Sequence, residues 1–249
     1  MAETMSAPRT WTLYLPPLAT VGALSLPDEP RGIVLLAHGS GGCRFSRRIN
    51  HIASILQEAG LATFSFDLVT ADEAADPAKI FDIPLLTERV LLASELVRQY
   101  PEACHLPVGY FGTGTGAAAA LVAAARAPFA VAAVVSGGGR PDLAGSALAR
   151  VQAPTLLVVG SRDYELLTLN EIALTRMRCE KDLKVVPGAR HHFHEPGTLD
   201  RVVTFASHWF REHLNAAEAP SDAAALRGSQ RLWATTDGSA GASLGQLSG

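Results

Sequence analysis

Apolar residues follow two different spacings along this chain, and the two spacings alternate. Ile33 to Ala37 is a wholly apolar run, which is typical of a strand that is buried on both faces. Ser46 to Ala59 then carries isoleucine and leucine at helical spacing and is followed by Gly60, a common helix stop. Because strand and helix patterns continue to alternate further on, we expect an α/β fold with a mostly parallel central sheet and helices on both faces.

The other elements follow from the same patterns. Thr10 to Leu15 and Thr20 to Leu26 flank Pro16-Pro17 and predict a hairpin or two edge strands. Further strands are predicted at Leu61–Phe66, Val108–Phe111, Val131–Ser136, Thr155–Gly160 and Leu183–Val186. Further helices are predicted at Pro84–Tyr100, in the alanine-rich run that ends near Arg126, and at Leu143–Arg150, Leu166–Met177 and Leu199–Leu214.

Length and local composition predict the domain organisation. The chain has 249 residues, of which 48% are hydrophobic, and this is enough for one well-buried α/β core. We therefore expect a single domain over residues 1–215, with residues 1–28 supplying its N-terminal strands. After Leu214 the composition shifts to Ala, Ser and Gly, so residues 216–249 are predicted to form a flexible tail.

Charge and cysteine content exclude several classes of function. The net charge of −3 and the pI near 6.2 give no basic surface for nucleic acid or an anionic membrane, so neither is expected as a partner. Met1 to Pro8 lacks the features of a signal peptide, and no apolar stretch is long enough to span a bilayer, so we expect a cytoplasmic protein. Cys43, Cys104 and Cys179 are widely spaced, which argues against a disulfide framework or a zinc site.

The candidate chemistry centres on the sequence VGYFGTGTGA at residues 108–117, where a strand runs into a helix through a glycine-rich turn. In the G-x-S-x-G turn of serine hydrolases, the central residue is the nucleophile and stands on a strained bend. Gly112 and Gly116 match that pattern here, and Gly114 occupies the central position. The turn is therefore that of a nucleophile, but it carries no nucleophilic side chain.

The same turn also fits a second motif. Gly112-x-Gly114-x-x-Ala117 matches the fingerprint of dinucleotide-binding folds. That fingerprint normally follows the first strand, and an acidic residue at the end of the next strand holds the ribose. Here several strands precede the turn, and the next strand ends in SGGGR at residues 136–140 without a carboxylate. We therefore favour the catalytic interpretation and expect no cofactor.

Two later loops carry the side chains that the catalytic interpretation requires. Asp163 follows one predicted strand and His191 follows the next, which gives the order nucleophile, acid, base. The carboxylate would fix the tautomer of the imidazole and stabilise the imidazolium formed on proton transfer. The oxyanion would be bound by two backbone N–H groups, one from Thr115 and one from the loop after the first buried strand, at Ser40.

Six segments together resemble bacterial α/β-hydrolases of the dienelactone-hydrolase-like type over about Gly32 to Leu214: HGSGG, AGLATFSFDL, YFGTGTGAAAALVAAA, SGGGRPDLAG, LLVVGSRD and VVPGARHHFHEPG. The resemblance implies the α/β-hydrolase fold, hydrolysis of small carboxylic esters or lactones, and an ester-like small molecule as ligand. In that family the turn reads G-x-S-x-G or carries cysteine, and the aspartate and histidine stand where Asp163 and His191 stand here. This chain departs from the family pattern at Gly114, the residue that would form the covalent bond.

Several interpretations of the site stay open. Gly114 has three interpretations. It could replace the serine of a hydrolase, it could belong to a non-catalytic descendant that binds a ligand or partner, or it could be a glycine favoured by a tight turn. Cys43 could substitute as nucleophile, and the hydroxyls of Thr113 and Thr115 are expected to point away from the pocket. Alternatively, His191 could activate a water molecule in the vacant space.

Asp163 and the histidines also have simpler interpretations. Asp163 precedes an apolar-periodic run and could cap a helix. His191, His192 and His194 suggest a metal cluster, but adjacent residues rarely point the same way and only Glu195 adds a further ligand type nearby. We expect no bound metal.

Overall fold

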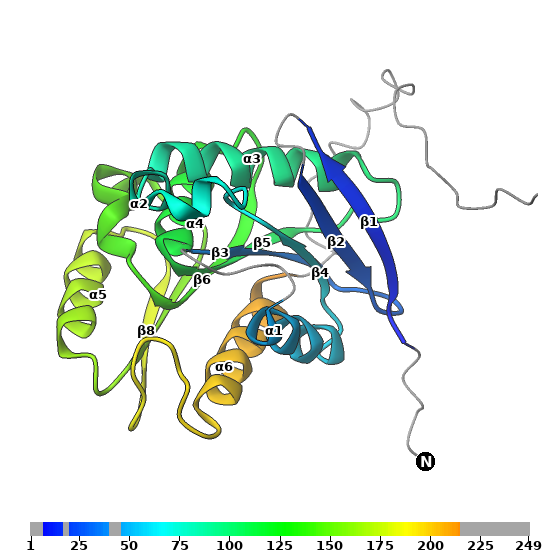
Figure 1. Cartoon of the computed structure of the whole chain (residues 1–249). Helices are drawn as coiled ribbons and strands as arrows, with labels where there is room; N and C mark the ends of the chain where they lie inside the picture. Colours follow the sequence, from blue (N-terminus) through cyan, green and yellow to red (C-terminus); the bar gives the residue numbers. More distant parts are fainter. Residues whose placement is uncertain (1–6, 17–19, 40–45, 215–249) are drawn as a thin grey trace, which may run out of the picture. The chain divides into compact units, whose positions relative to one another are not determined.

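The computed structural model describes residues 7–16, 20–39 and 46–214, and Figure 1 shows them in colour. The chain divides into two compact units, Met1–Ala219 and Pro220–Gly249. The second unit lies outside the described residues, and so do the predicted flexible tail, the predicted oxyanion donor Ser40 and the alternative nucleophile Cys43. Within the described ranges no helix has both the length and the apolar character needed to cross a lipid bilayer.

The described residues form an eight-stranded sheet with the order β1-β2-β4-β3-β5-β6-β7-β8. The first two strands make an antiparallel edge with β4, whereas all the other pairs are parallel, which confirms the predicted mostly parallel sheet. The strands are β1 (Arg9–Leu15), β2 (Thr20–Leu26), β3 (Ile33–His38), β4 (Ala62–Phe66), β5 (Val108–Gly114), β6 (Val131–Gly139), β7 (Thr155–Gly160) and β8 (Lys181–Val186).

Helices cover both faces of this sheet (Figure 1). One face carries α1 (Arg47–Glu58) and α6 (Thr198–His213), and the other carries α3 (Ile83–Gln99), α4 (Thr115–Arg126), the 3₁₀ helix η2 (Pro141–Arg150) and α5 (Tyr164–Arg176). The side chains of β3 alternate between the two cores: Ile33 and Leu35 pack with α3 and α4, and Val34 and Leu36 pack with α1 and α6. The wholly apolar run is therefore a strand buried on both faces, as predicted.

The first long helix shows how the sequence pattern produces the structure. The Ser46 hydroxyl accepts a hydrogen bond from the Ile49 N–H at 3.2 Å and so caps α1. Ile49, Ile52 and Leu56 lie one turn apart and are buried against the sheet. Gly60 has a φ of 79°, a conformation that glycine adopts readily and other residues avoid. The helix thus begins and ends where the sequence predicts.

The structure differs from the predicted elements in several places. The strand β5 continues beyond Phe111 to Gly114, and the helix predicted at Leu143–Arg150 is the 3₁₀ helix η2. The polar stretch after β4 contains two short helices, η1 (Glu73–Ala75) and α2 (Pro77–Ile80). In addition, β6 continues beyond Ser136 to Gly139, where it pairs with the end of β5 at Gly114. A side chain at Gly139 would collide with Ala117, so this extended pairing requires glycine.

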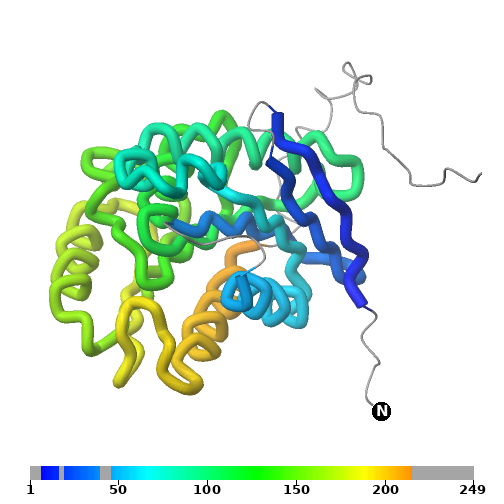
Figure 2. The backbone as a smooth tube through the Cα atoms, in the orientation of Figure 1, coloured from blue at the N-terminus to red at the C-terminus, as the bar shows by residue number. Residues whose placement is uncertain are grey.

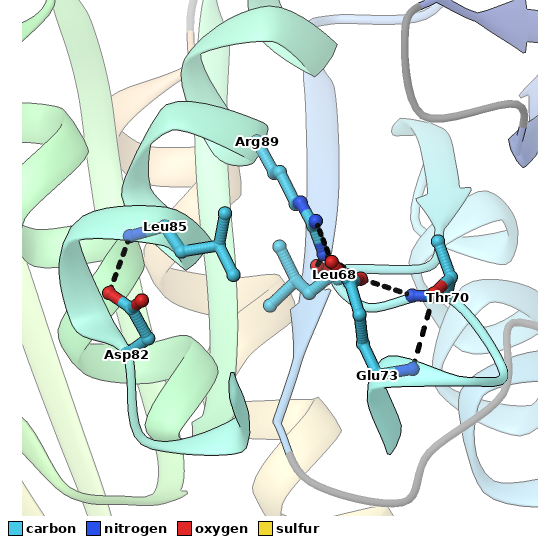
Figure 3. Close-up of polar contacts among 6 residues, drawn as sticks. All are labelled: Leu68, Thr70, Glu73, Asp82, Leu85 and Arg89. Carbon is cyan, nitrogen blue, oxygen red and sulfur yellow. Dashed lines mark hydrogen bonds and ion pairs between the residues drawn. The ribbon is translucent and has the colours of Figure 1, made fainter. Parts of the chain in front are cut away.

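An ion pair holds the stretch after β4 against α3 (Figure 3). The guanidinium of Arg89 donates to both carboxylate oxygens of Glu73, each at 2.7 Å, and also to the carbonyl of Leu68. Glu73 further accepts from the Thr70 N–H at 2.8 Å. The side chain of Arg89 is only 5% exposed, and its hydrogen bonds lower the pKa of Glu73 to about 2.

We expect Glu73→Gln to lower the free energy of unfolding by about 2 kcal/mol, because it leaves the buried Arg89 cation without its counter-charge. The folded-state pKa of Glu73 lies below its ordinary value, so the stabilisation is complete above about pH 4.5 and is lost as pH falls toward 2. Urea titration at pH 7 and pH 3 measures both effects. Glu88→Gln is the matched control, because the Arg126–Glu88 pair is also 2.7 Å long but exposed. Equal losses from the two variants would contradict the prediction.

Candidate functional site

The glycine turn between β5 and α4 is a sharp bend from strand to helix. Gly114 ends the strand and precedes the first residue of the helix, with φ 53° and ψ −130°. A Cβ atom at Gly112 would overlap the backbone of Ala117, and one at Gly116 would overlap the carbonyl of Ala37. These two glycines are therefore required because helix and strand backbones touch there.

Gly114 is different, because space does not require a glycine at that position. Among the described residues, the nearest atom to a Cβ built on Gly114 is the Cα atom of Gly39, at an ordinary contact distance of 3.8 Å. Only the positive φ disfavours a side chain, at a cost of about 1–2 kcal/mol. Strain of this kind is what a nucleophile elbow imposes on its central residue. The turn thus accommodates a side chain at the position where this sequence has none.

Asp163 makes both of the interactions that the sequence suggested for it. Its Oδ1 atom accepts from the Leu166 N–H at 3.2 Å and caps α5, while its Oδ2 atom lies 2.6 Å from Nδ1 of His191. Because the carboxylate accepts, the Nδ1–H of the imidazole donates, and the Nε2 atom then carries the lone pair. Capping fixes the carboxylate, and the carboxylate fixes the tautomer of His191.

The loop that carries His191 is attached to the loop that carries Asp163. Figure 2 shows the histidine loop as the yellow segment between β8 and α6. The Gly188 N–H donates to the Ser161 hydroxyl at 2.8 Å, and the Arg162 N–H donates to the carbonyl of Ala189 at 2.9 Å. A side chain at Gly160 would overlap that same carbonyl. Asp163 and His191 therefore belong to one hydrogen-bonded unit at the carboxyl ends of the strands.

A cavity of about 430 Å³ brings the predicted residues together. Gly114, Asp163 and His191 all line it, which places the vacant position, the acid and the base around one space. The other described residues of its wall are His38, Gly39, Ser46, Arg48, Ile49, Thr113, Gly138, Arg140, Glu165, Leu166, Leu169 and His192. The volume is in the range of a site for a small molecule.

Both arginines that line the described part of this wall have hydrogen-bond partners. Arg140 donates to both carboxylate oxygens of Asp142, at 2.8 and 2.7 Å, and this interaction raises its pKa. Arg48 donates to the carbonyl of His192, and burial lowers the pKa of Arg48. Burial, followed by the nearby charges of His191 and Arg48, lowers the pKa of His192. Arg48 could not be identified from the sequence, because its contact with His192 spans 144 residues.

The structure describes some of the remaining predicted residues and not others. Thr115 is the first residue of α4, so its N–H has no acceptor within the helix. The Thr115 side chain is only 3% exposed and does not line the cavity, whereas Thr113 does. Ser40 and Cys43 lie outside the described residues. No group of three histidine, cysteine or acidic residues in the described part of the chain is arranged to hold a metal ion.

Comparison with known proteins gives matches over most of the chain. The model of the dienelactone hydrolase family matches residues 21–221. Proteins of two Mycobacterium tuberculosis strains, provisionally named phosphoribosyl transferases, are 50% identical over 198 residues. Their match covers 80% of this chain but 45% of each relative, so the chain spans less than half the length of these relatives.

Solved structures show the same likeness. The crystal structure of dienelactone hydrolase from Anabaena variabilis is 45% identical, with a TM-score of 0.80, and the match covers 84% of this chain and 100% of that chain. A dienelactone hydrolase-like promiscuous phosphotriesterase from metagenomic libraries is 19% identical, with a TM-score of 0.68 over 84% of this chain and 100% of its own. The second likeness supports the fold alone.

Proposed function

Because the chain belongs to the dienelactone hydrolase family, we propose that its cavity binds small carboxylic esters or lactones and that the chain, with glycine at position 114, forms no acyl-enzyme. The observation that carries this proposal is the 2.6 Å contact between Asp163 and His191 on a cavity that Gly114 also lines. The acid and the base of an acyl-transfer site are arranged around a position that has no nucleophile.

Each group has a defined role in this proposal. The ester carbonyl would lie over the elbow, with its oxygen toward the Thr115 N–H at the start of α4. His191 would present Nε2 to the ligand, oriented by Asp163. Covalent catalysis requires an oxygen or sulfur at position 114 to attack the carbonyl carbon. Without such an atom, the site binds the ester but cannot form the covalent intermediate that replaces one difficult step of hydrolysis by two easier ones.

The same contact between Asp163 and His191 supports a second candidate function, direct attack by water. A water molecule beside Gly114 could give its proton to His191 and hydrolyse the ester in one step. An oxyanion hole and substrate binding without an intact triad leave a rate about 10³ to 10⁴ above the uncatalysed reaction. Such hydrolysis would be slow and would show no burst, which distinguishes it from acyl-enzyme chemistry.

Two other activities receive less support. Phosphoribosyl transfer is not part of the proposal, because more than half of each provisionally named transferase lies outside the match. Dinucleotide binding through Gly112-x-Gly114-x-x-Ala117 is disfavoured by the family match and by β6, which ends at Gly139 and is followed by Arg140 instead of an acidic residue.

With p-nitrophenyl acetate, we expect the unmodified chain to give no burst of nitrophenol, because no side chain at position 114 accepts the acetyl group. Saturation-transfer NMR is expected to show that δ-valerolactone binds. Leu169→Trp should reduce that signal because Leu169 lines the cavity, while Ile172→Trp is the matched control, on the exposed side of the same helix. An acetyl group mapped by mass spectrometry to any residue of the cavity would refute the absence of an acyl-enzyme.

A further inference from the structure

The cavity retains two of the three parts of an acyl-transfer site, and those two parts suit another reaction. A general base and a donor for a developing oxyanion are also what an enzyme needs to remove a proton from the carbon next to a carbonyl. Hydrolysis needs a nucleophile as well, whereas this reaction does not. Losing the nucleophile therefore removes acyl transfer and leaves the machinery for proton abstraction in place.

We propose that the cavity catalyses enolisation: His191 removes a proton from the carbon adjacent to the carbonyl of a bound ester or lactone. The inference rests on the proposed function for the class of ligand and goes beyond it in the reaction. His191 Nε2 takes the proton, the C–H electron pair forms a carbon–carbon double bond, and the carbonyl π pair moves onto oxygen. Return of the proton to the same carbon, or to a conjugated one, completes an exchange or an isomerisation without any other reactant.

The base is fixed in the state that this step requires. Asp163 is anchored on both oxygens, one by the Leu166 N–H and the other by His191. The imidazole therefore carries its proton on Nδ1 and its lone pair on Nε2. The loop is also held by the hydrogen bond from the Gly188 N–H to the Ser161 hydroxyl, which attaches it to the loop that carries Asp163. A base held in this way loses little freedom on taking the proton.

The space above Gly114 admits the substrate to that base. In a serine hydrolase the hydroxyl fills this space and is the group closest to the carbonyl carbon. Within the described part of the chain, a Cβ atom at this position would meet only the Cα atom of Gly39, at 3.8 Å, and Gly114 lines the cavity. A cavity of about 430 Å³ holds a five- or six-membered lactone. A lactone ring above Gly114 would place its α carbon next to His191, with no nucleophilic side chain at position 114.

The enolate oxygen would be stabilised where the oxyanion of acyl transfer would be. A twelve-residue helix begins directly after Gly114, which lines the cavity, and the N-terminal end of this helix carries a partial positive charge. Arg48 adds a cation to the same wall. Of the two acidic residues in the described part of this wall, Asp163 is paired with His191 and Glu165 is exposed to solvent. The cavity thus favours a developing negative charge on the ligand.

The test uses α-angelica lactone, a butenolide whose C3 protons lie between a carbonyl and a double bond. In D₂O, we expect the unmodified chain to replace these protons by deuterium about 10² to 10⁴ times faster than matched buffer, with accumulation of the conjugated isomer, as proton NMR measures. His191→Gln should reduce the rate to that of buffer, and Asp163→Asn should reduce it at least ~10-fold, because asparagine still caps α5 but selects the wrong tautomer.

Matched controls separate the chemistry from the fold. His208→Gln changes an exposed histidine of α6, and Asp82→Asn changes a cap whose bond to the Leu85 N–H is 3.1 Å long; both should exchange at the unmodified rate. Gly114→Ser should divert the lactone to ring opening. Exchange that is as fast in folded His191→Gln as in the unmodified chain would overturn the inference. A lactone that binds without exchanging overturns the inference alone, whereas a lactone that does not bind overturns the proposed function.

Discussion

Gly114→Ser is expected to convert the chain into an esterase, with kcat/KM for short acyl esters rising by about 10³-fold or more. Removing a triad serine costs about 10⁶-fold in a serine hydrolase, so restoring one should regain a large part of that factor. The backbone at position 114 has φ 53°, and a new Cβ atom would lie 3.8 Å from its nearest neighbour among the described residues, which is an ordinary contact distance. Asp163 and His191 are already paired at 2.6 Å.

Stopped-flow release of nitrophenol from p-nitrophenyl acetate measures this gain, together with labelling by a fluorophosphonate. The probe's phosphorus should bond to the serine oxygen with loss of fluoride, and mass spectrometry should place it at position 114. Gly114→Ala is the matched control, because it imposes the same backbone strain without a hydroxyl. Adding Asp163→Asn to the serine variant should lower kcat by about 10³ to 10⁴. A folded serine variant that is inert and unlabelled would show that the acid–base pair is not a working catalytic pair.

Gly116→Ala is expected to cost about 4 kcal/mol or more in the free energy of unfolding, and Gly114→Ala about 1–2 kcal/mol. The two glycines are two residues apart in the same turn, but their surroundings differ. A methyl group at Gly116 would overlap the carbonyl of Ala37 in β3, and neither backbone can move without separating α4 from the sheet. At Gly114 the added methyl has room, and only its positive φ is unfavourable.

Thermal unfolding provides the comparison. For a domain of this size, we expect the Tm of Gly116→Ala to fall by about 10 °C or more and that of Gly114→Ala by about 4 °C. Circular dichroism of both variants at 20 °C shows whether the helices remain formed. Equal losses at the two positions would mean that close packing does not distinguish these glycines, and the elbow geometry described above would then be wrong.

The fold and the acid–base pair could be predicted because local signals and chain order determine them. The apolar run at Ile33–Ala37 indicated a strand buried on both faces, and Ser46 marked the start of α1. Asp163 and His191 each follow a strand of the parallel sheet, and the carboxyl ends of such strands meet at one edge. Two residues 28 positions apart in sequence could therefore be expected to lie in one site.

Contacts between distant segments could not be predicted in the same way. Arg48 reaches the carbonyl of His192 across 144 residues, and Arg89 pairs with Glu73 from a different helix. Both arginines lie in segments with a helical sequence pattern, and an arginine in such a segment is usually exposed to solvent. The extension of β6 to Gly139 was missed because a run of glycines is normally a turn signal, and only its pairing with Gly114 makes it a strand.

The close packing of the turn around Gly114 also affects which residues of the site are retained during evolution. Gly112, Gly116 and Gly160 are required by backbone contacts that a folded chain needs whether or not any ester is cleaved. Natural selection for folding alone therefore preserves the turn and the attachment of the histidine loop, even in a lineage without hydrolytic activity. Glycine and serine codons can differ by a single base, as GGC and AGC do. Where the codon of Gly114 is GGC or GGT, a single base change would place serine on a turn that has kept its geometry.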